Sequence, residues 1–498
     1  MGVKKRERVF LTGASGSMGF ATFKGLWARR EDYEIVLLLR PTAAEKKMFR
    51  AYESAAGIKP VKGVGIVEGD GLKIVWGDAL NKEDVIEACQ GIDWCLHVMA
   101  LISPAADRDP EMAEKVNYLA TKTIVEAIEA QDPDHIRMVY IGTVAEYGDR
   151  LPPVHVGRTG DPVVPSEFDY YALSKIKAEL CVMQSRIKHR VSLRQTFIMI
   201  PDIISLQDPI MFHQPINSFM ENITARDSGR LLVNCLDIEE ESDFWGAYYN
   251  ISGGPRCRIT FLEFLDSIYT MLGIRYRKVM ERKWFALRNF HMQFYEDSAK
   301  LNDYLHHWEG GQTQEEYFNE VWEKLSSFLK ATAWLAKAIP PYRWVVETAT
   351  RSQLKKLAFM EDGTMGWISK QDEGKINAFY GSMEAYRNIP DWDQQMPSLD
   401  HDHDYTRLNH GFDESKAELE LSDLQQAASF RGGMLVSEEW NGDMHLPLAW
   451  KCCQEHDFSF TPHAVLKGGH WCHQCISPPW DYDTLKEKNQ FAAQVINP

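Results

Sequence analysis

Apolar and polar residues change their spacing several times within the first 140 residues of the chain. Short runs that are apolar at almost every position are typical of strands buried on both faces of a parallel sheet. Such runs occur at residues 9–12, 34–39, 72–76, 94–99 and 137–141. Apolar residues at helical spacing occur between them, at residues 19–29, 82–88 and 112–131. This alternation predicts the α/β class, with a doubly wound parallel Rossmann sheet covered by helices on both faces.

The strict alternation ends after the fifth of these strands. A loop rich in Pro and Gly then leads into a helix from Tyr170, which is followed by a strand at residues 191–200. We therefore expect a smaller substrate subdomain inside a first unit of residues 1–275. Helical spacing with many aromatic residues follows, which predicts a mostly helical extension of unknown role at residues 276–435. A separate small module is expected at residues 436–498.

The composition is ordinary for a globular protein of several domains: 498 residues, with 44% hydrophobic and 25% charged positions. It excludes a disordered, collagen-like or membrane-embedded chain. The net charge of −16 would repel phosphate backbones and anionic lipid, so we expect no nucleic-acid and no membrane partner, although a local basic patch is not excluded. There is no apolar signal core and no apolar run approaching the ~18 residues of a membrane span, so we expect a cytoplasmic protein.

A glycine-rich turn at residues 12–19 joins the first predicted strand to the first predicted helix. Gly13 permits a tight turn, Gly16 lets the backbone approach a pyrophosphate, and Gly19 lets the helix pack close to the strand. The N-terminus of the helix offers free N–H groups and a positive dipole end to the phosphates. The turn therefore predicts a dinucleotide site formed by Gly13, Ser15, Gly16, Ser17, Met18 and Gly19.

The residue that follows the second predicted strand bears on the choice of cofactor. An acidic residue ordinarily stands there to bind the ribose hydroxyls, but this chain has Arg40. A guanidinium suits a 2′-phosphate, so we predict NADP(H), with NAD as the alternative. Asp78, after the third strand, is placed to accept a hydrogen bond from the adenine amino group. The simpler interpretations are a solvated Arg40 and a turn-capping role for Asp78.

Tyr171 and Lys175 are spaced to share one face of the helix predicted from Tyr170. A phenol with its ordinary pKa of about 10 is a weak acid–base catalyst at neutral pH. A neighbouring ammonium and an oxidised nicotinamide ring stabilise the phenolate and lower that pKa. Together with the glycine turn, this pair indicates an oxidoreductase site.

Over residues 8 to about 275 the chain resembles the extended short-chain dehydrogenase/reductase superfamily, in particular its NAD-dependent epimerase/dehydratase family. The motifs that carry the resemblance are the glycine turn, the Tyr171/Lys175 pair followed by Glu179, and residues 93–100, 117–121, 143–148 and 248–254. It implies that Tyr171 donates or accepts the proton, and that Lys175 holds the ribose hydroxyls and tunes Tyr171. It also implies that Thr143 hydrogen-bonds the substrate oxygen and that Ala100 lines the cofactor. Family members often pair through the helices that carry Tyr171 and residues 112–131, so a homodimer is one expectation.

One departure from the family pattern bears on the substrate. Many members that bind nucleotide sugars carry an Arg-x-x-Asn run after the sixth strand, whereas Arg194 is followed here by no Asn and then by apolar residues. Apolar side chains in a pocket would suit a small hydrophobic carbonyl or alcohol, and a plain core position is an equally simple interpretation for each of them. The residues concerned are Phe197, Met199, Met211 and Phe212.

Three functions are therefore in competition. The first is an NADP(H)-dependent oxidoreductase of the ketone reductase or alcohol dehydrogenase type, acting on a small, rather apolar substrate through Thr143, Tyr171 and Lys175. The alternative keeps the same residues but holds NAD(P) tightly, as a nucleotide-sugar epimerase or dehydratase. A further alternative is a non-catalytic dinucleotide sensor, which would need no proton relay.

Cysteines are scattered singly through the first half of the chain, which suggests a reducing compartment, but they cluster near its C-terminus. Cys452 with His456, and Cys472 with Cys475, supply four ligands in two closely spaced pairs, the pattern of a closed structural zinc site. Their surroundings resemble treble-clef and zinc-ribbon modules. With four positions filled, the site would stabilise or recognise rather than catalyse. Reduced thiols, a redox pair, or Cys453 in place of Cys452 are the alternatives. The other imidazoles of the module are expected in solvent: His463, His470 and His473.

Overall fold

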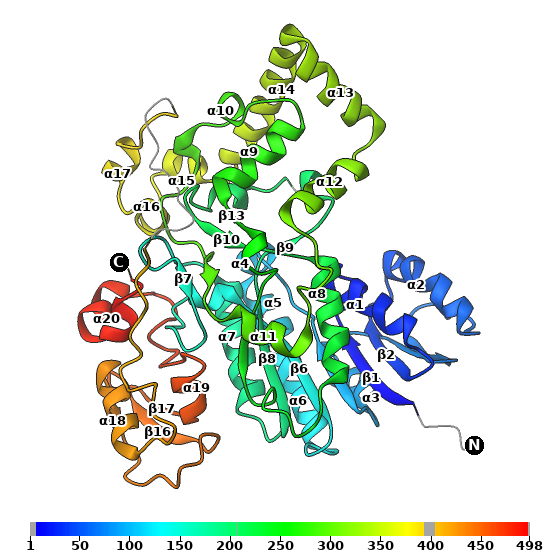
Figure 1. Cartoon of the computed structure of the whole chain (residues 1–498), viewed down its shortest axis with the longest axis vertical. Helices are drawn as coiled ribbons and strands as arrows, with labels where there is room; N and C mark the ends of the chain where they lie inside the picture. The colour runs from blue at the N-terminus through cyan, green and yellow to red at the C-terminus, as the bar shows by residue number, and fades with distance from the viewer. Residues whose placement is uncertain (1–5, 206, 393–403, 497–498) are drawn as a thin grey trace.

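An eight-stranded sheet lies at the centre of the protein in the computed structural model, which describes residues 6–205, 207–392 and 404–496 (Figure 1). Its strands are β1 (Glu7–Thr12), β2 (Tyr33–Leu39), β3 (Gly65–Gly69), β4 (Leu72–Trp76), β5 (Trp94–His97), β6 (Arg137–Thr143), β8 (His189–Gln195) and β12 (Tyr248–Ile251). They follow the order β12-β8-β6-β5-β1-β2-β4-β3. All neighbours are parallel except β3, which pairs antiparallel with β4 at one edge.

Helices cover both faces of this sheet: α1 (Ser17–Ala28), α2 (Ala43–Ala55), α3 (Lys82–Cys89), α4 (Ala105–Arg108), α5 (Pro110–Ala113), α6 (Ala120–Glu129), α7 (Tyr170–Met183), α8 (Ala225–Asn234) and α11 (Ser298–Leu305). Successive side chains of a strand point to opposite faces. In β1, Val9 and Leu11 lie in one hydrophobic core with residues of α1 and α8. Phe10 lies in a second core with residues of α3, α6 and α7. The predicted doubly wound Rossmann sheet is therefore confirmed.

The predicted elements agree with the structure to within a few residues, except at four places. The strand expected over residues 191–200 ends at Gln195, and Ile198 and Met199 form a separate short strand outside the central sheet. The helix expected over residues 112–131 contains a π-helical segment, η1 (Glu114–Leu119), between α5 and α6. The predicted elements include neither α2, in which five of the 13 residues are charged, nor β3, a short strand that carries two glycines at the sheet edge. Of these, α2 carries Glu45, which contacts the candidate residue Arg40, and η1 carries Asn117, which contacts the catalytic helix.

A further hydrophobic core is built from the segments that follow β8. Its helices are α9 (Phe261–Met271), α10 (Tyr276–Val279), α12 (Gln314–Lys324), α13 (Ser327–Ala338), α14 (Pro340–Ala358), α15 (Thr364–Lys370), α16 (Glu373–Tyr380) and α17 (Met383–Arg387). Short strands pair beside it: β7 (Val156–Gly157) with β14 (Phe294–Tyr295), β9 (Ile198–Met199) with β11 (Ile223–Thr224), and β10 (Phe219–Glu221) with β13 (Arg258–Thr260). Met199 and Phe212 are completely buried in this core. They are core residues and do not line an open apolar pocket.

The C-terminal segment, residues 404–496, packs along α7 (Figure 1). It contains α18 (Leu421–Phe430), β15 (Met434–Leu435), β16 (Leu448–Lys451), β17 (Asp457–Phe460), α19 (Pro462–Leu466), α20 (Tyr482–Lys488) and α21 (Gln490–Ala493). Its apolar side chains share one core with Val163, Ile176 and Leu180. Ile176 and Leu180 of α7 are thus covered within one chain, and pairing of two chains through α7 would need its other residues. Among the described helices, none is long and apolar enough to cross a membrane.

The close packing of α1 on β1 can be tested at two glycines. A Cβ added at Gly19 would lie 2.1 Å from the Gly13 carbonyl oxygen, whereas a Cβ at Gly16 would meet its nearest atom at an ordinary 3.5 Å. We expect Gly19→Ala to lower the free energy of unfolding by about 1–3 kcal/mol, and Gly16→Ala by less than about 0.5 kcal/mol. Chemical denaturation of the two variants measures this difference. Equal stabilities would contradict the packing described here.

Candidate active site

The predicted cofactor-binding turn lies where β1 ends, at the edge of the sheet that the carboxyl ends of the parallel strands share. Gly13 has a φ of +69°, in the left-handed region, and a Cβ there would lie 2.9 Å from the Met99 backbone. Gly16 and Ser17 are exposed at the start of α1, and no side chain in the described ranges caps that helix. The first N–H groups of α1 are therefore open to an anion, which fits a pyrophosphate.

A buried chain of hydrogen bonds fixes the backbone beside this turn. The hydroxyl oxygen of Thr12 accepts from the Met99 N–H at 3.1 Å and lies 2.7 Å from His97 Nδ1. His97 Nε2 lies 2.7 Å from the hydroxyl of Thr121 on α6. Burial lowers the pKa of His97 to about 3, so the ring is neutral. These hydrogen bonds connect β1, β5 and α6 and fix the start of the loop that contains Ala100.

Asn117 on the π-helical segment η1 connects this loop to α7. Its side-chain oxygen accepts from the Leu101 N–H at 2.6 Å, and its amide nitrogen donates to the Ser174 hydroxyl at 2.8 Å. The side chain is completely buried. π-Helical turns are frequent at functional sites because they shift a side chain out of the regular helical register. Here Asn117 holds the loop after β5 against the helix that carries the catalytic candidates.

Thr143, Tyr171 and Lys175 come together where β6 ends against the first turns of α7. Thr143 is the last residue of β6, and its side chain hydrogen-bonds that of Tyr171. The Lys175 ammonium is buried and donates to the Ile141 carbonyl at 2.6 Å. Burial lowers the pKa of Lys175 to about 8 and raises that of Tyr171 above its ordinary value. At neutral pH the phenol is therefore protonated and the ammonium is mostly charged, the state required to donate a proton.

The structure adds a carboxyl group that no sequence motif indicates. Asp107 on α4 accepts a hydrogen bond from the Tyr171 N–H at 3.2 Å, although the two residues are 64 positions apart. Burial and the charge of Asp169, which caps α7, raise the pKa of Asp107 to about 7. His291 in turn lies 3.2 Å from the Asp169 carboxylate. A carboxyl group that titrates near neutral pH, here at the start of the helix that carries Tyr171, is suited to general acid–base work.

Arg40 and Asp78 lie just beyond the ends of β2 and β4. The Arg40 guanidinium is 69% exposed, and it donates to Glu45 at 2.8 Å, while the Arg40 backbone N–H donates to the same carboxylate at 2.9 Å. Glu45 thus positions the guanidinium and leaves it open to solvent. The Asp78 carboxylate accepts from the Leu80 N–H at 3.0 Å, which is the turn-capping role offered above as its simpler interpretation.

Behind the catalytic candidates lies a buried cluster of ionisable side chains: Glu146, Glu179, Arg194 and His470. Arg194 donates to Glu179 at 2.6 Å, and His470 Nε2 donates to the same carboxylate at 2.7 Å. Burial alone would raise the pKa of Glu179, but Arg194 and His470 hold it well below its ordinary value. Burial and the charge of Glu179 raise the pKa of Glu146 well above its ordinary value. The cluster therefore holds one ionised and one neutral carboxyl group.

This cluster joins three parts of the chain. Glu146 accepts a hydrogen bond from the Thr143 N–H at 3.3 Å, and Glu179 lies one helical turn after Lys175 on α7. His470 comes from the C-terminal segment and is only 1% exposed, so the prediction that it lies in solvent is wrong. A local sequence pattern cannot show this contact, because its partner is 291 residues away.

The four predicted metal ligands form a second cluster. Nδ1 of His456 lies 3.4 Å from Sγ of Cys452, 3.5 Å from that of Cys472 and 3.6 Å from that of Cys475. Bonds of about 2.3 Å to sulfur and about 2.0 Å to nitrogen give a tetrahedral S–N edge of about 3.5 Å. Hydrogen bonds among the thiols lower the pKa of Cys452 and raise the pKa values of Cys472 and Cys475, so the Cys452 thiol is the first of the three to lose its proton. The adjacent Cys453 is not part of this group.

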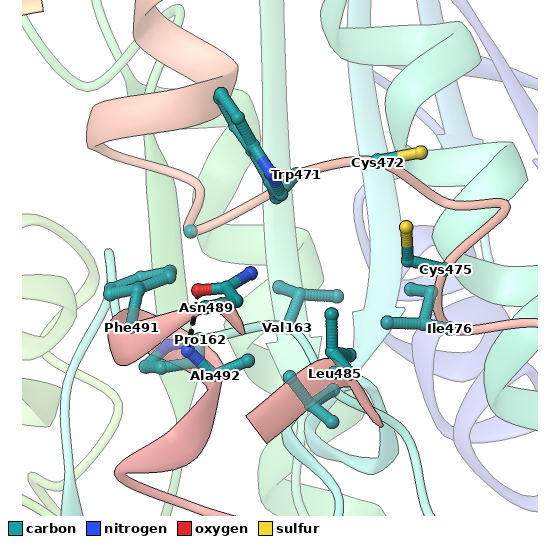
Figure 2. Close-up of a pocket in the computed structure, with 12 residues that line it drawn as sticks. Pro162, Val163, Trp471, Cys472, Cys475, Ile476, Leu485, Asn489, Phe491 and Ala492 are labelled. Atoms are coloured by element: carbon teal, nitrogen blue, oxygen red, sulfur yellow. Dashed lines mark hydrogen bonds between the residues drawn. The ribbon is translucent and has the colours of Figure 1, made fainter. Parts of the chain in front are cut away.

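Figure 2 shows Cys472 and Cys475 close together at one side of a cavity in the C-terminal segment. The cavity there is lined by side chains such as Val163, Trp471 and Leu485. Its volume is about 10 Å³, enough for roughly one water molecule. This cavity is a packing void of the shared core and is too small for a substrate.

Comparisons with known proteins agree with the fold. Residues 9–214 match the family model described as "NAD dependent epimerase/dehydratase family". No sequence among the curated proteins matches the chain. The chain is also similar to solved structures, all at low sequence identity.

One is dTDP-glucose 4,6-dehydratase from Bacillus anthracis, solved in complex with NAD. The two sequences are 16% identical, the alignment covers 66% of this chain and 100% of the dehydratase chain, and the TM-score is 0.47. A second is UDP-glucuronic acid 4-epimerase from Bacillus cereus in complex with UDP-glucuronic acid and NAD, at 16% identity, 64% and 100% coverage and a TM-score of 0.47. A third is a dTDP-glucose 4,6-dehydratase double mutant from Streptomyces venezuelae, at 18% identity, 66% and 99% coverage and a TM-score of 0.48.

The family match spans the glycine turn, the end of β6 and the first turns of α7, the three places where the structure puts the cofactor-binding and catalytic candidates. It confirms the resemblance drawn from the sequence motifs. Residues 9–214, which include seven of the eight strands of the central sheet except the first two residues of β1, are thus similar to the NAD-dependent epimerase/dehydratase family.

Proposed function

We propose that the protein is an NAD(P)-dependent epimerase or dehydratase that oxidises a secondary hydroxyl of a nucleotide sugar and later returns the hydride. The observation that carries the proposal is an intact Thr143, Tyr171 and Lys175 group inside the segment matched to the epimerase/dehydratase family. A ketone reductase for apolar substrates has less support, because Met199 and Phe212 are buried core residues and Phe197 and Met211 are partly buried against the same core. A non-catalytic sensor would need no protonated phenol beside a threonine hydroxyl.

The roles of the residues follow from their surroundings. The exposed glycine turn and the uncapped N–H groups of α1 would hold the pyrophosphate, and the bound cofactor would supply hydride transfer. Thr143 orients the substrate oxygen toward Tyr171, whose phenol gives a proton to a carbonyl oxygen or, as phenolate, takes one from a hydroxyl. The charged Lys175 favours the phenolate. Asp107 is the group able to move a second proton, which an elimination of water requires.

The reaction class is tested by measuring substrate conversion together with the net change in NAD(P)H. An epimerase or dehydratase should convert a nucleotide sugar, tried as UDP-glucuronic acid and dTDP-glucose, without net change in NAD(P)H absorbance. It should also carry cofactor through purification. Stoichiometric oxidation of NAD(P)H with a simple ketone, and no conversion of any nucleotide sugar, would overturn the proposal.

In the same assay, Tyr171→Phe should lower turnover by at least about 100-fold, because the ring remains but the transferable proton is gone. Cofactor affinity, followed by tryptophan fluorescence, should stay within about twofold of the parent value. Tyr170→Phe is the matched control, since it removes a neighbouring phenol from the same helix turn. Unchanged turnover in Tyr171→Phe would place the chemistry elsewhere.

For the cofactor we propose NADP(H), supported by the exposed guanidinium of Arg40 and its positioning by Glu45. NADPH should bind roughly tenfold more tightly than NADH, and Arg40→Ala should remove that difference by weakening NADPH alone. Fluorescence titration with both cofactors measures this. Lys47→Ala, which removes a nearby positive charge outside the described contacts of Glu45, is the control. A preference of the parent protein for NADH would contradict the proposal.

For the C-terminal cluster we propose one structural zinc ion. Purified protein should contain about one zinc per chain, Cys472→Ser should lose it, and Cys453→Ser should retain it. Removal of the metal should loosen residues 404–496 to limited proteolysis and leave the sheet folded, because the sheet has cores of its own. Turnover should then fall as well, since the segment supplies His470 to the cluster behind Thr143. Zinc-free protein with an intact C-terminal segment would refute the assignment.

A further inference from the structure

Helices α13 and α14 form a hairpin that projects from one end of the molecule, at the top of Figure 1. One side of the hairpin is anchored: Ala336, Leu354 and Ala358 are buried in the core that follows β8, and Ala333 is buried as well. The rest of the hairpin carries large apolar side chains in solvent. Trp334 and Trp344 are each 67% exposed, and the others are Phe328, Ile339 and Val345.

The number of large exposed apolar side chains in this short segment is unusual for a surface that faces water. Isolated exposed apolar residues are common on soluble proteins, but gathered patches mark interaction sites. Here five lie within residues 328–345, on either side of the turn at Ile339 and Pro340. The buried alanines and leucine show that the hairpin already has a packed inner side. Its exposed apolar side chains are therefore available to something outside the chain.

The charge of the hairpin indicates what that partner is. Residues 327–358 contain six Lys and Arg and a single carboxylate, whereas the chain as a whole carries −16. That carboxylate, Glu347, is buried and paired with Arg275 at 2.9 Å. Lys337, Lys355 and Lys356 are exposed. Arg351 and Lys330 pair with Glu281 and Glu323 outside this range. The exposed Lys337 follows Trp334 on α13, and Lys355 and Lys356 lie about three helical turns after Trp344 on α14, so the hairpin carries both basic and aromatic exposed side chains.

We propose that this hairpin docks on the surface of an anionic lipid bilayer. Tryptophan side chains favour the boundary between headgroups and acyl chains, and nearby Lys and Arg are attracted to anionic headgroups. Neither helix is long and apolar enough to cross a bilayer, so the hairpin lies on the surface. A second copy of the chain fits less well, because a symmetric contact would bring two sets of like charges together. The inference is independent of the proposed function.

Flotation with lipid vesicles tests the proposal. The intact protein should float with vesicles that contain about one third phosphatidylserine, and much less with pure phosphatidylcholine vesicles. Raising the salt to about 0.5 M should weaken the binding, because it screens the headgroup charge. Trp334→Ala with Trp344→Ala, and separately Lys355→Glu with Lys356→Glu, should each reduce the floated fraction by at least about fivefold. Cofactor binding in the absence of vesicles should stay unchanged in these variants, which shows that they fold.

Lys59→Glu with Lys62→Glu is the matched control, since it makes the same charge change at exposed positions near β3, away from the hairpin. This variant should float like the parent protein. Four results would overturn the proposal. The first three are no flotation of the parent protein, equal flotation with and without phosphatidylserine, and loss of flotation in the control. The fourth overturning result is a parent dimer in analytical ultracentrifugation that the double tryptophan variant converts to monomer, because the hairpin would then be an interface between copies.

Discussion

One buried ion pair, between Glu179 of α7 and Arg194 of β8, connects the parts on which the candidate site depends. Both side chains are completely buried, and their charged atoms lie 2.6 Å apart. Removing one partner of such a pair leaves an unpaired charge in the interior, which typically costs about 3–5 kcal/mol. Each partner is therefore kept in place by the other. Since Lys175 lies one helical turn before Glu179, the pair also fixes the catalytic helix against the sheet.

The same pair explains why the C-terminal segment is more than an appended module. Arg194 donates to the Gly468 carbonyl at 2.8 Å, and His470 donates to Glu179. The segment also shares its apolar core with α7 through Ile176 and Leu180. A metal ion held by this segment would therefore stabilise the surroundings of the catalytic helix without touching substrate.

The site divides into residues that the sequence could indicate and residues that it could not. The glycine turn, Thr143 and the Tyr171/Lys175 pair are recognisable because each is a short motif within one element or at its end. Asp107 and His470 carry no such signal, since their roles depend on contacts across elements, and although Glu146 lies in the motif at residues 143–148, its neutral state depends on the distant Glu179. The apolar residues after Arg194 show the opposite problem. Hydrophobicity marks Met199 and Phe212 as buried, but it does not distinguish a substrate pocket from a packed core.

By itself the sequence determined the fold class, the order of the sheet-forming segments and the identity of the catalytic and metal-binding candidates. The fold class and the metal-binding candidates follow from local properties, namely the period of apolar residues, glycine conformation and the spacing of ligands along the chain, whereas Thr143 and the catalytic roles come from the resemblance to a known family. Only the tertiary structure decided which charges are ionised, what the C-terminal segment contacts, and that Trp334 and Trp344 face solvent. Those outcomes depend on burial and on partners far away in the sequence, because a side chain's charge and exposure are set by everything that packs around it.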